Sequence, residues 1–303
     1  MFDGILPIWK EAGMTSHDVV FKLRKILGMK KIGHTGTLDP DVEGVLLICL
    51  GKATKLVEFL MDGEKVYQGG ICLGISTETE DASGDIVEQV AVSAEITEKK
   101  IDQMMTTMIG HIQQIPPYYS AVKVQGKKLY EYARQGIEVE RPIRHATIKE
   151  FKRTSQLRHN TDQATVEWDF YVRCSKGTYV RTLAVDLGVK LGYPAHMSHL
   201  QRMETGGFSK LETLTLEEVK NSVDKGILND KIYSVDDVTL GMPFLHINEY
   251  QYEEIRYGKL LPKNYFSIEP DPYLAVYYQD KLIGIYQVHP EKQHFIKPKK
   301  MIM

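Results

Sequence analysis

One carboxylate of this chain lies in a segment that restricts its backbone. Asp39 is followed by Pro40, and proline pushes the residue before it toward extended geometry, which disfavours a helical turn at Asp39. Gly33 and Gly36 precede it and permit backbone conformations and close approaches that other residues forbid. The apolar sequence that follows predicts a buried strand. We interpret Gly33–Pro40 as a short loop that presents an acid for chemistry on a ligand.

Two further side chains could complete such a site. Arg181 is predicted to lie about three residues into a helix, where its charge opposes the positive end of the helix dipole. That position is reasonable if a carboxylate lies opposite and accepts a bidentate hydrogen bond. Tyr67 lies in a predicted strand and could offer a ring or a hydroxyl. Each residue also has an ordinary structural explanation, as a turn acid, a surface arginine or a packed tyrosine.

Motifs for metals and nucleotide phosphates are incomplete in this sequence. Asp39–Gly44 matches the start of a calcium loop, but the bidentate acid required at the twelfth position is replaced by Leu50. The pair Gly51-Lys52 fails as a phosphate-binding loop, because Ala53 follows it and Leu46 stands where the first glycine is needed. We therefore expect no metal and no cofactor.

The cysteines and two nearby histidines indicate no chemistry of their own. Cys49, Cys72 and Cys174 are far apart and lie in apolar or strand-like sequence, so we expect three buried thiols in a reducing compartment. His196 and His199 have a spacing compatible with metal binding, but no further ligand lies close to them in the sequence. We expect a cytoplasmic protein, since neither a signal peptide nor a membrane-spanning run is present.

The charges of this 303-residue chain are segregated along the sequence despite a formal net charge of −2. Basic residues gather between Val19 and Leu38 without an intervening acid, and again in 123–128, 141–153 and 292–300. Acids concentrate around 78–88 and 212–237. A basic face for nucleic acid is therefore possible, although any one of these runs could equally be a solvated surface.

Periodicity predicts a mixture of helices and strands without a regular alternation. The capping pair Thr15 and Asp18, the apolar spacing that follows and the stop at Gly28 predict a helix over about 17–27. We expect further helices over 55–61, 98–110, 129–135, 180–191 and 249–257, and strands over 45–50, 67–74, 85–92 and 166–174. The interpretation is an α+β fold (mixed α/β) with a central mixed β-sheet, neither a Rossmann nor a TIM arrangement.

We expect two domains and one excursion. A polar, proline-rich and basic stretch at about 116–143 predicts a thumb-like insertion that closes over a ligand or is an ordinary surface connection. The character of the sequence changes near residue 238, where short strands and a hairpin at 273–288 begin. We therefore assign 1–238 to a catalytic domain and 239–303 to a small β-rich domain.

Several motifs in this order resemble the bacterial tRNA pseudouridine synthase B family. They are the loop 33–40, the run 44–55, the stretches 118–127 and 129–134, and Ser175–Leu183. Together they span most of residues 1–210 and are more specific than any single short pattern. Residues 239–303 more loosely resemble the RNA-binding PUA domain that is common at the carboxy terminus of such enzymes.

The resemblance implies isomerisation of the T-loop uridine at position 55 of tRNA to pseudouridine. It implies that Asp39 is the essential carboxylate, which either attacks the sugar carbon or abstracts a sugar proton, and that Arg181 holds Asp39 ionised. Tyr67 would stack on the base and assist proton loss at C5. Further substrate-binding residues implied by the resemblance are His34, which would fill the space of the extruded nucleotide, the uracil-pocket residues Tyr179 and Leu200, and Lys55.

The partners implied are the T stem-loop of tRNA, no membrane and no obligate protein, with a monomer as the expected state. Extrusion of a base costs a few kcal/mol, which aromatic and planar groups beside the acid would offset. Two alternatives stay open, a guide-RNA-dependent pseudouridine synthase subunit and a tRNA-folding chaperone with incidental catalysis. The stretch at 116–143 argues against the first, because it resembles the thumb of stand-alone enzymes.

Overall fold

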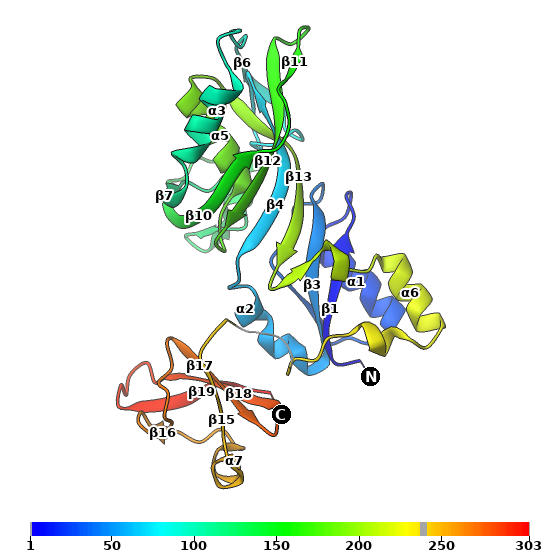
Figure 1. Ribbon diagram of the computed structural model, residues 1–303, viewed down its shortest axis with the longest axis vertical. Helices are drawn as coiled ribbons and strands as arrows, with labels where there is room; N and C mark the ends of the chain where they lie inside the picture. The colour runs from blue at the N-terminus through cyan, green and yellow to red at the C-terminus, as the bar shows by residue number, and fades with distance from the viewer. Residues whose placement is uncertain (1, 237–240, 303) are drawn as a thin grey trace. The chain divides into compact units, whose positions relative to one another are not determined.

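The structure is a computed structural model that describes residues 2–236 and 241–302 (Figure 1). The chain divides into two compact units, and each is described by itself. The first contains residues 1–41, 45–63 and 206–303, and the second contains 42–44 and 64–205. The expected domain boundary at 238/239 lies outside the described residues. In the described part of the chain, no helix has the length and apolar character needed to cross a bilayer.

The first unit begins with a three-stranded segment covered by helices. Its elements up to residue 60 are β1 (Gly4–Lys10), α1 (Ser16–Leu27), β2 (Ile32–Thr35), most of β3 (Glu43–Leu50), the 3-10 helix η1 (Gly51–Leu56) and α2 (Val57–Leu60). After residue 206 it adds β14 (Phe208–Ser209), η2 (Lys210–Glu212), α6 (Leu216–Asp224) and η3 (Leu228–Lys231). β1 and β2 both pair with β3.

The helix predicted over 17–27 is confirmed as α1. Thr15 caps it in a capping box with Asp18, and Gly28 ends it in the left-handed conformation with φ 61°. Its buried face joins the core formed by one side of β3, which includes Leu46 and Ile48. The other side of β3 joins a second core. Burial on both faces explains why β3 is a continuous apolar run rather than an alternating one.

A small five-stranded sheet forms the carboxy-terminal part of the first unit. Its elements are β15 (Phe244–His246), α7 (Glu249–Ile255), β16 (Leu261–Pro262), β17 (Tyr273–Tyr278), β18 (Lys281–Val288) and β19 (Phe295–Met301), with strand order β15-β17-β18-β19-β16. Gln279 and Asp280 both have positive φ in the turn between β17 and β18, as a two-residue hairpin turn requires. The predicted hairpin and the β-rich carboxy-terminal region are confirmed.

The second unit is built on long antiparallel strands. Their order is β13-β4-β12-β10-β7, with β11 beside β12. The strands are β4 (Lys65–Leu73), β5 (Ile75–Thr77), β6 (Ile86–Gln89), β7 (Gly110–Gln114), β8 (Lys123–Val124), β9 (Lys127–Lys128), β10 (Arg144–Arg153), β11 (Arg158–Asn160), β12 (Thr165–Cys174) and β13 (Ala195–Thr205). The helices are α3 (Glu98–Thr106), α4 (Leu129–Ala133) and α5 (Val180–Leu191).

The sheet is mixed, as the sequence predicts. Glu43 and Gly44 of β3 pair in parallel with Gln201 and Arg202 of β13, whereas β13, β4, β12, β10 and β7 pair antiparallel. The strand predicted over 166–174 is confirmed as β12, in which buried residues such as Trp168 and Phe170 alternate with partly exposed ones. α3 contacts β10, α5 contacts β13, and the two helices contact each other on one face of the sheet (Figure 1).

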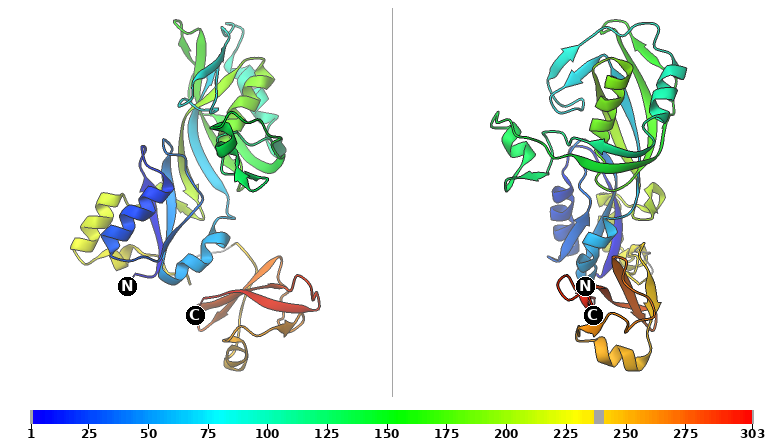
Figure 2. Two further views of the ribbon diagram at one scale, coloured as in Figure 1. Left: turned by 180° about the vertical axis from the view of Figure 1, so that it is seen from behind. Right: turned by 90° about the vertical axis from the view of Figure 1, so that its left-hand side faces the viewer.

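The thumb-like stretch projects from the sheet of the second unit. β8 and β9 pair around a turn at Gln125 and Gly126, both with positive φ, and α4 follows directly. The right-hand view of Figure 2 shows this segment standing away from the strands. Whether it closes over a ligand stays a prediction.

Three predicted elements differ in extent. The helix expected over 55–61 is confirmed for Val57–Leu60 as α2, whereas Lys55 and Leu56 belong to the 3-10 helix η1, which begins earlier, at Gly51. The Asp3 carboxylate accepts hydrogen bonds from the amides of Lys52 (2.7 Å) and Ala53 (3.4 Å) near the start of η1. The helix expected over 98–110 ends at Thr106, since the chain turns into β7. The strand expected over 85–92 is reduced to β6.

The prediction of three buried thiols is correct for two of them. Cys49 and Cys174 are fully buried, and burial raises the pKa of Cys49 to about 12 and that of Cys174 to about 11. Cys72 is only partly buried, because it faces the polar side of β4 next to Glu167. The expectation of full burial at Cys72 is therefore wrong.

Candidate active site

Asp39 lies in a loop of the first unit that is shorter than the sequence suggests. Gly33, His34 and Thr35 belong to β2, which pairs with residues 47–50 of β3, so the loop begins only at Gly36. Gly36 adopts φ 67°, a conformation that favours glycine. Asp39 is partly buried.

The residue before Asp39 is anchored by a buried serine. Leu38 is 4% exposed, and its amide donates to the Ser16 hydroxyl at 2.9 Å. The same hydroxyl lies 3.4 Å from the Leu38 carbonyl oxygen, to which it donates. Ser16 is the first residue of α1, so the start of this helix sets the position of the loop.

The residue after Asp39 is anchored by a buried lysine. Lys10 is the last residue of β1 and is fully buried. Its ammonium donates to the carbonyl oxygens of Pro40 (2.9 Å), Met14 (2.6 Å) and Glu11 (3.0 Å), and the Gly13 amide also donates to Pro40 at 3.0 Å. Neither Lys10 nor Ser16 was predicted from the sequence as part of the site. A lysine at the end of an apolar strand was the one available signal.

His34 and Lys55 also belong to the first unit. His34 lies on β2 opposite Ile48 and is partly buried, with its ring edge-on to His17 at a centroid distance of 6.1 Å. Lys55 lies in η1, and its ammonium donates to the Met301 carbonyl oxygen at 2.7 Å. His34 lies shortly before the Asp39 loop in the sequence. Lys55, in contrast, binds the last residue of β19.

Tyr67 and Leu200 lie on neighbouring strands of the second unit. Tyr67 is on β4, opposite Val172 on one side and Arg202 on the other, and it is 8% exposed. Leu200 lies on β13 opposite Gly69, where an added Cβ would come within 2.9 Å of the Leu200 side chain. The register of β13 is irregular on both sides of Leu200, which alters the direction of its side chains.

Arg181 is the second residue of α5 and is 7% exposed. Its guanidinium donates to the carbonyl oxygens of Thr79 and Tyr119, each at 3.0 Å, and lies 3.5 Å from the Asp81 carboxylate. Within the second unit Asp81 forms an ion pair with this cation, at a distance longer than that of a bidentate hydrogen bond. Asp39 belongs to the other unit, so its pairing with Arg181 stays a prediction.

The acidic loop between β5 and β6 builds this environment. The Asp81 carboxylate accepts from the Thr79 hydroxyl (2.6 Å) and from the amide (3.0 Å) and hydroxyl (2.6 Å) of Ser83. Glu80 has φ 64° and accepts from the Thr182 hydroxyl at 2.9 Å. Burial raises the pKa of Glu80 above its ordinary value. From the sequence, this loop was predicted only as a concentration of acids.

Tyr179 is held at the start of α5 by a buried glutamine. Gln114 is 2% exposed, and its amide group donates to the Tyr179 carbonyl oxygen at 3.1 Å and accepts from the Tyr179 backbone amide at 3.0 Å. Tyr179 and Arg181 are therefore placed together at one end of α5. Among the candidates in the second unit, these two form one group and Tyr67 and Leu200 form another.

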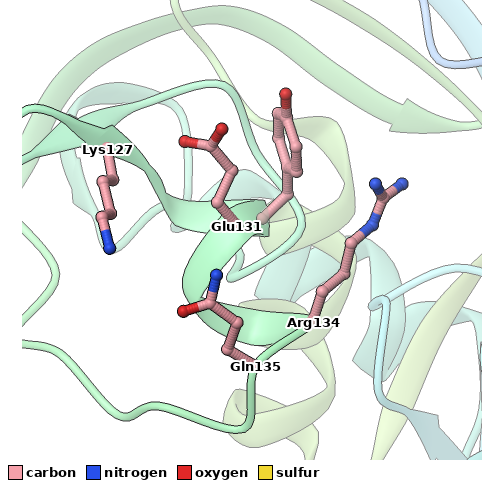
Figure 3. A pocket seen from close by; sticks show the side chains of 5 residues that line it. Lys127, Glu131, Arg134 and Gln135 are labelled. Carbon is pink, nitrogen blue, oxygen red and sulfur yellow. The ribbon is translucent and has the colours of Figure 1, made fainter.

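The thumb-like stretch carries a hollow lined by charged side chains. Its volume is about 360 Å³, and Lys127, Tyr130, Glu131, Arg134 and Gln135 line it (Figure 3). The Lys128 ammonium and the Arg134 guanidinium lie 5.4 and 5.2 Å from the centre of the Tyr130 ring. Cations next to an aromatic ring are suited to contacts with nucleic acid.

The histidines considered as metal ligands have other partners. The Nδ1 atom of His196 lies 2.8 Å from the Ile75 carbonyl oxygen, and His199 lies 3.7 Å from Asp169. Within residues 2–236 and 241–302, no group of three or more His, Cys, Asp or Glu residues is arranged to hold a metal ion.

Two family profiles match consecutive parts of the chain. Residues 24–180 match a family described as TruB family pseudouridylate synthase (N terminal domain). Residues 181–238 match a family described as tRNA pseudouridylate synthase B C-terminal domain.

Curated relatives are similar over the whole length. A protein of Halalkalibacterium halodurans named tRNA pseudouridine synthase B is 48% identical over 300 residues, which are 99% of this chain and 97% of that one. A protein of Listeria innocua with the same name is 50% identical over 301 residues, 99% of this chain and 98% of that one. Among solved structures, a chain of a Cbf5-Nop10-Gar1 complex superposes with a TM-score of 0.72 at 26% identity, covering 99% of this chain and 85% of that chain.

These matches confirm the resemblance in the sequence. The mixed sheet and the β-rich carboxy-terminal region are those of a pseudouridine synthase fold. Because the relatives are close to half identical over nearly every residue, the chain belongs to the TruB family of pseudouridylate synthases.

Proposed function

We propose that this chain is a tRNA pseudouridine synthase that isomerises the T-loop uridine at position 55 to pseudouridine. One observation carries the proposal, the near 50% identity over full length to relatives named tRNA pseudouridine synthase B. The rigid mounting of Asp39 between Ser16 and Lys10 supports it, because a reacting carboxylate must keep its geometry.

The reaction rearranges one nucleotide without a net change of composition. The uridine leaves the RNA stack, its glycosidic bond from N1 to C1′ breaks, the base rotates, and a new bond forms from C5 to C1′. The proton on C5 is then lost and N1 gains one. Asp39 starts this sequence either by attack on C1′ or by abstraction of a sugar proton, and both routes require its ionised form.

The other candidates are given roles that match their placement. Arg181 holds Asp39 ionised and oriented, and its own position is supported by the two carbonyl oxygens and the Asp81 carboxylate around it. Tyr67 stacks on the base and assists proton loss at C5. His34 takes the place of the extruded nucleotide in the RNA.

Further residues bind the substrate. Tyr179 and Leu200 line the uracil pocket, and Lys55 contacts the RNA. The thumb-like stretch 116–143, with its hollow that contains Lys127 and Arg134, and the β-rich region 239–303, as a PUA-like domain, extend the RNA-binding surface. We also propose that the enzyme acts in the cytoplasm as a monomer without an obligate protein partner.

A guide-RNA-dependent enzyme is the second candidate, because the solved chain with TM-score 0.72 belongs to a complex with Nop10 and Gar1. The higher identity to the synthase B relatives favours the stand-alone enzyme.

Pseudouridine mapping of a tRNA transcript incubated with this protein alone tests the proposal. We expect one new pseudouridine, at position 55, and none in a transcript with cytidine at that position. Conversion that requires an added guide RNA or protein would establish the second candidate, and modification of a different uridine would contradict the assigned position.

A further inference from the structure

A basic surface on α1 has no part in the site described above. It consists of exposed residues in the second half of the helix and in the link to β2, namely Phe21, Lys22, Arg24, Lys25, Lys30 and Lys31. No acidic residue occurs between Val19 and Leu38. We call this set the α1 basic surface.

Part of this charge has a structural explanation. The Arg24 guanidinium donates to the Ile32 carbonyl oxygen at 3.3 Å, and Arg24 and Lys25 suit the negative end of the helix dipole. Lys22 lies one turn after Asp18, whose pKa is lowered, first by hydrogen bonds from Thr15 and in smaller part by this lysine. These roles leave Lys30 and Lys31 unexplained and Lys25 only partly explained.

Lys25, Lys30 and Lys31 differ from most exposed cations of the chain. Lys149, Lys152, Lys259 and Lys263 each lie close to a carboxylate. Among the residues that the structure describes, no carboxylate lies within ion-pair distance of Lys25, Lys30 or Lys31. Lys30 and Lys31 are consecutive in the sequence, so their like charges repel each other, and a bound polyanion would offset this repulsion.

The backbone that carries these lysines is fixed. The Lys30 carbonyl oxygen accepts from the Ile32 amide and the Lys31 carbonyl oxygen accepts from the Gly51 amide, both at 3.0 Å. Met29 between them and the helix is buried in the core. Ligand binding would therefore order only the side chains of the lysines, which lowers its entropic cost.

An aromatic ring completes the surface. Phe21 is 56% exposed, and the Lys25 ammonium lies 4.4 Å from the centre of its ring. An exposed ring beside cations is a common arrangement for contact with nucleic acid. A protein with a formal net charge of −2 needs such local surfaces to hold RNA.

The position of the surface relates it to the Asp39 loop within the same unit. α1 begins at that loop, where Ser16 binds Leu38, and Lys25 follows nine residues later. At 1.5 Å per residue this is about 14 Å along the helix axis. RNA whose extruded base reaches Asp39 would present other phosphates to the α1 basic surface.

We propose that the α1 basic surface binds phosphates of the tRNA substrate at a distance from the reacting nucleotide. This inference rests on the proposed function for the identity of the RNA. It assigns a second anchoring surface to the tRNA, on α1 and the link to β2, in addition to the thumb-like stretch.

The test replaces three lysines and spares the residues with structural roles. The variant Lys25→Gln, Lys30→Gln, Lys31→Gln is compared with the control Lys220→Gln, Lys225→Gln, Lys231→Gln. The control removes the same charge from exposed positions of the same unit, on α6 and η3, where acids are close in sequence. A midpoint of thermal unfolding equal to that of the wild-type protein shows that each variant is folded.

Binding of full-length tRNA transcript and of an isolated T stem-loop is measured over a series of salt concentrations. We expect the α1 variant to bind full-length tRNA about tenfold more weakly at low salt and to flatten the slope of log K against log salt by about 2. We expect less than a twofold change for the control. A loss confined to full-length tRNA places the phosphates outside the T arm, and a loss with both RNAs places them in the T arm, so both support the proposal.

Unchanged affinity and slope for both RNAs would overturn the proposal, as would an equal loss in the control variant. The binding readout does not require turnover. A wild-type protein that forms no pseudouridine would therefore disprove the proposed function without affecting this comparison.

Discussion

The two residues that hold the backbone on either side of Asp39 are themselves buried and polar. Ser16 fixes the backbone before Asp39, and Lys10 fixes the backbone after it. Ser16 is a partner for the buried Leu38 amide, and Lys10 is a second donor, beside the Gly13 amide, to the Pro40 carbonyl oxygen. The geometry of the loop therefore depends on side chains that bind its backbone.

Replacement of Ser16 tests this dependence. Ser16→Ala leaves the Leu38 amide without its acceptor, so we expect a loss of about 1–3 kcal/mol in the free energy of unfolding. We also expect a lower kcat with a nearly unchanged KM, because the loop loses its geometry and not its contacts with RNA. Denaturant unfolding and steady-state kinetics measure both. Ser93→Ala, at an exposed serine, is the control, and equal effects in the two variants would refute the anchoring role.

Glu80 should make stability depend on pH. Its folded-state pKa is raised, first by burial, and the Arg181 and Arg141 charges lower it only in part. A raised pKa means that the carboxyl's contribution to stability is full below the unfolded pKa of about 4.3 and is lost as pH rises through the folded value. We therefore expect Glu80→Gln to gain stability relative to wild type as pH increases from 4 to 7.

Thermal unfolding of wild type and Glu80→Gln at several pH values measures this difference. Glu88→Gln removes one carboxylate from an exposed position of β6 and serves as control. A difference between wild type and Glu80→Gln that stays constant over this pH range would show that burial does not shift Glu80.

Individual helices and strands could be predicted from the sequence where the residues that define them lie close together along the chain. The caps of α1 and the alternation of β12 lie within a few residues of the elements they define, so both could be predicted. β2 was missed because its pairing with β3 overrides the glycine at position 33. The start of η1 was missed because its cap, Asp3, lies about fifty residues away in the sequence.

The same limit applies to the site. The candidates Asp39, Tyr67 and Arg181 could be found because their types and motifs are unusual. Asp81, which lies beside Arg181, could not be separated from the neighbouring acids, since only the fold of the loop from residue 78 to 85 brings it to that cation. Contacts between residues far apart in the sequence produce no periodic pattern along the chain, so they could not be predicted from it.

Gly44 at the start of β3 is a close-approach position. It has φ 135°, and an added Cβ would lie 2.3 Å from the Arg202 carbonyl oxygen on β13. We expect Gly44→Ala to cost about 3 kcal/mol, through both the backbone conformation and the clash. Gly13 also has a positive φ, but an added Cβ there would meet no atom within 4 Å. Gly13→Ala therefore isolates the conformational cost and should reduce the free energy of unfolding by less. Denaturant unfolding measures both losses of stability. Equal losses for Gly44→Ala and Gly13→Ala would contradict the close approach of Gly44 to β13.

At the scale of the whole molecule, the carboxy-terminal sheet shares a core with the amino-terminal strands of the first unit. Ala275, Ile285 and Ile302 cluster with Val45 and Leu47 of β3. The Phe59 and Tyr273 rings meet edge to face at 5.2 Å. The sequence predicted a separate small domain, and nothing in its local pattern indicated this shared core.

A double-mutant cycle measures that coupling. Phe59→Leu and Tyr273→Leu each remove one ring. Either substitution alone already abolishes the contact between the rings, so the double mutant should lose less stability than the sum of the two single losses. We expect this coupling free energy of unfolding to be about 0.5–1.5 kcal/mol. A matched cycle on Phe151 and Phe170, whose rings meet at 5.7 Å in the second unit, gives the reference value. Additive effects at Phe59 and Tyr273 would show that the two parts of the first unit do not share a core in solution.

We propose that Asp39 performs the bond change. Asp39→Asn keeps the shape of the side chain but removes the charge that either route requires. The decisive measurement is pseudouridine formation in a T-loop transcript by wild type and by this variant, with tRNA binding measured in parallel. We predict a loss of at least about 10³-fold in rate with affinity within a few-fold of wild type. Conversion by Asp39→Asn at a rate near that of wild type would contradict the account.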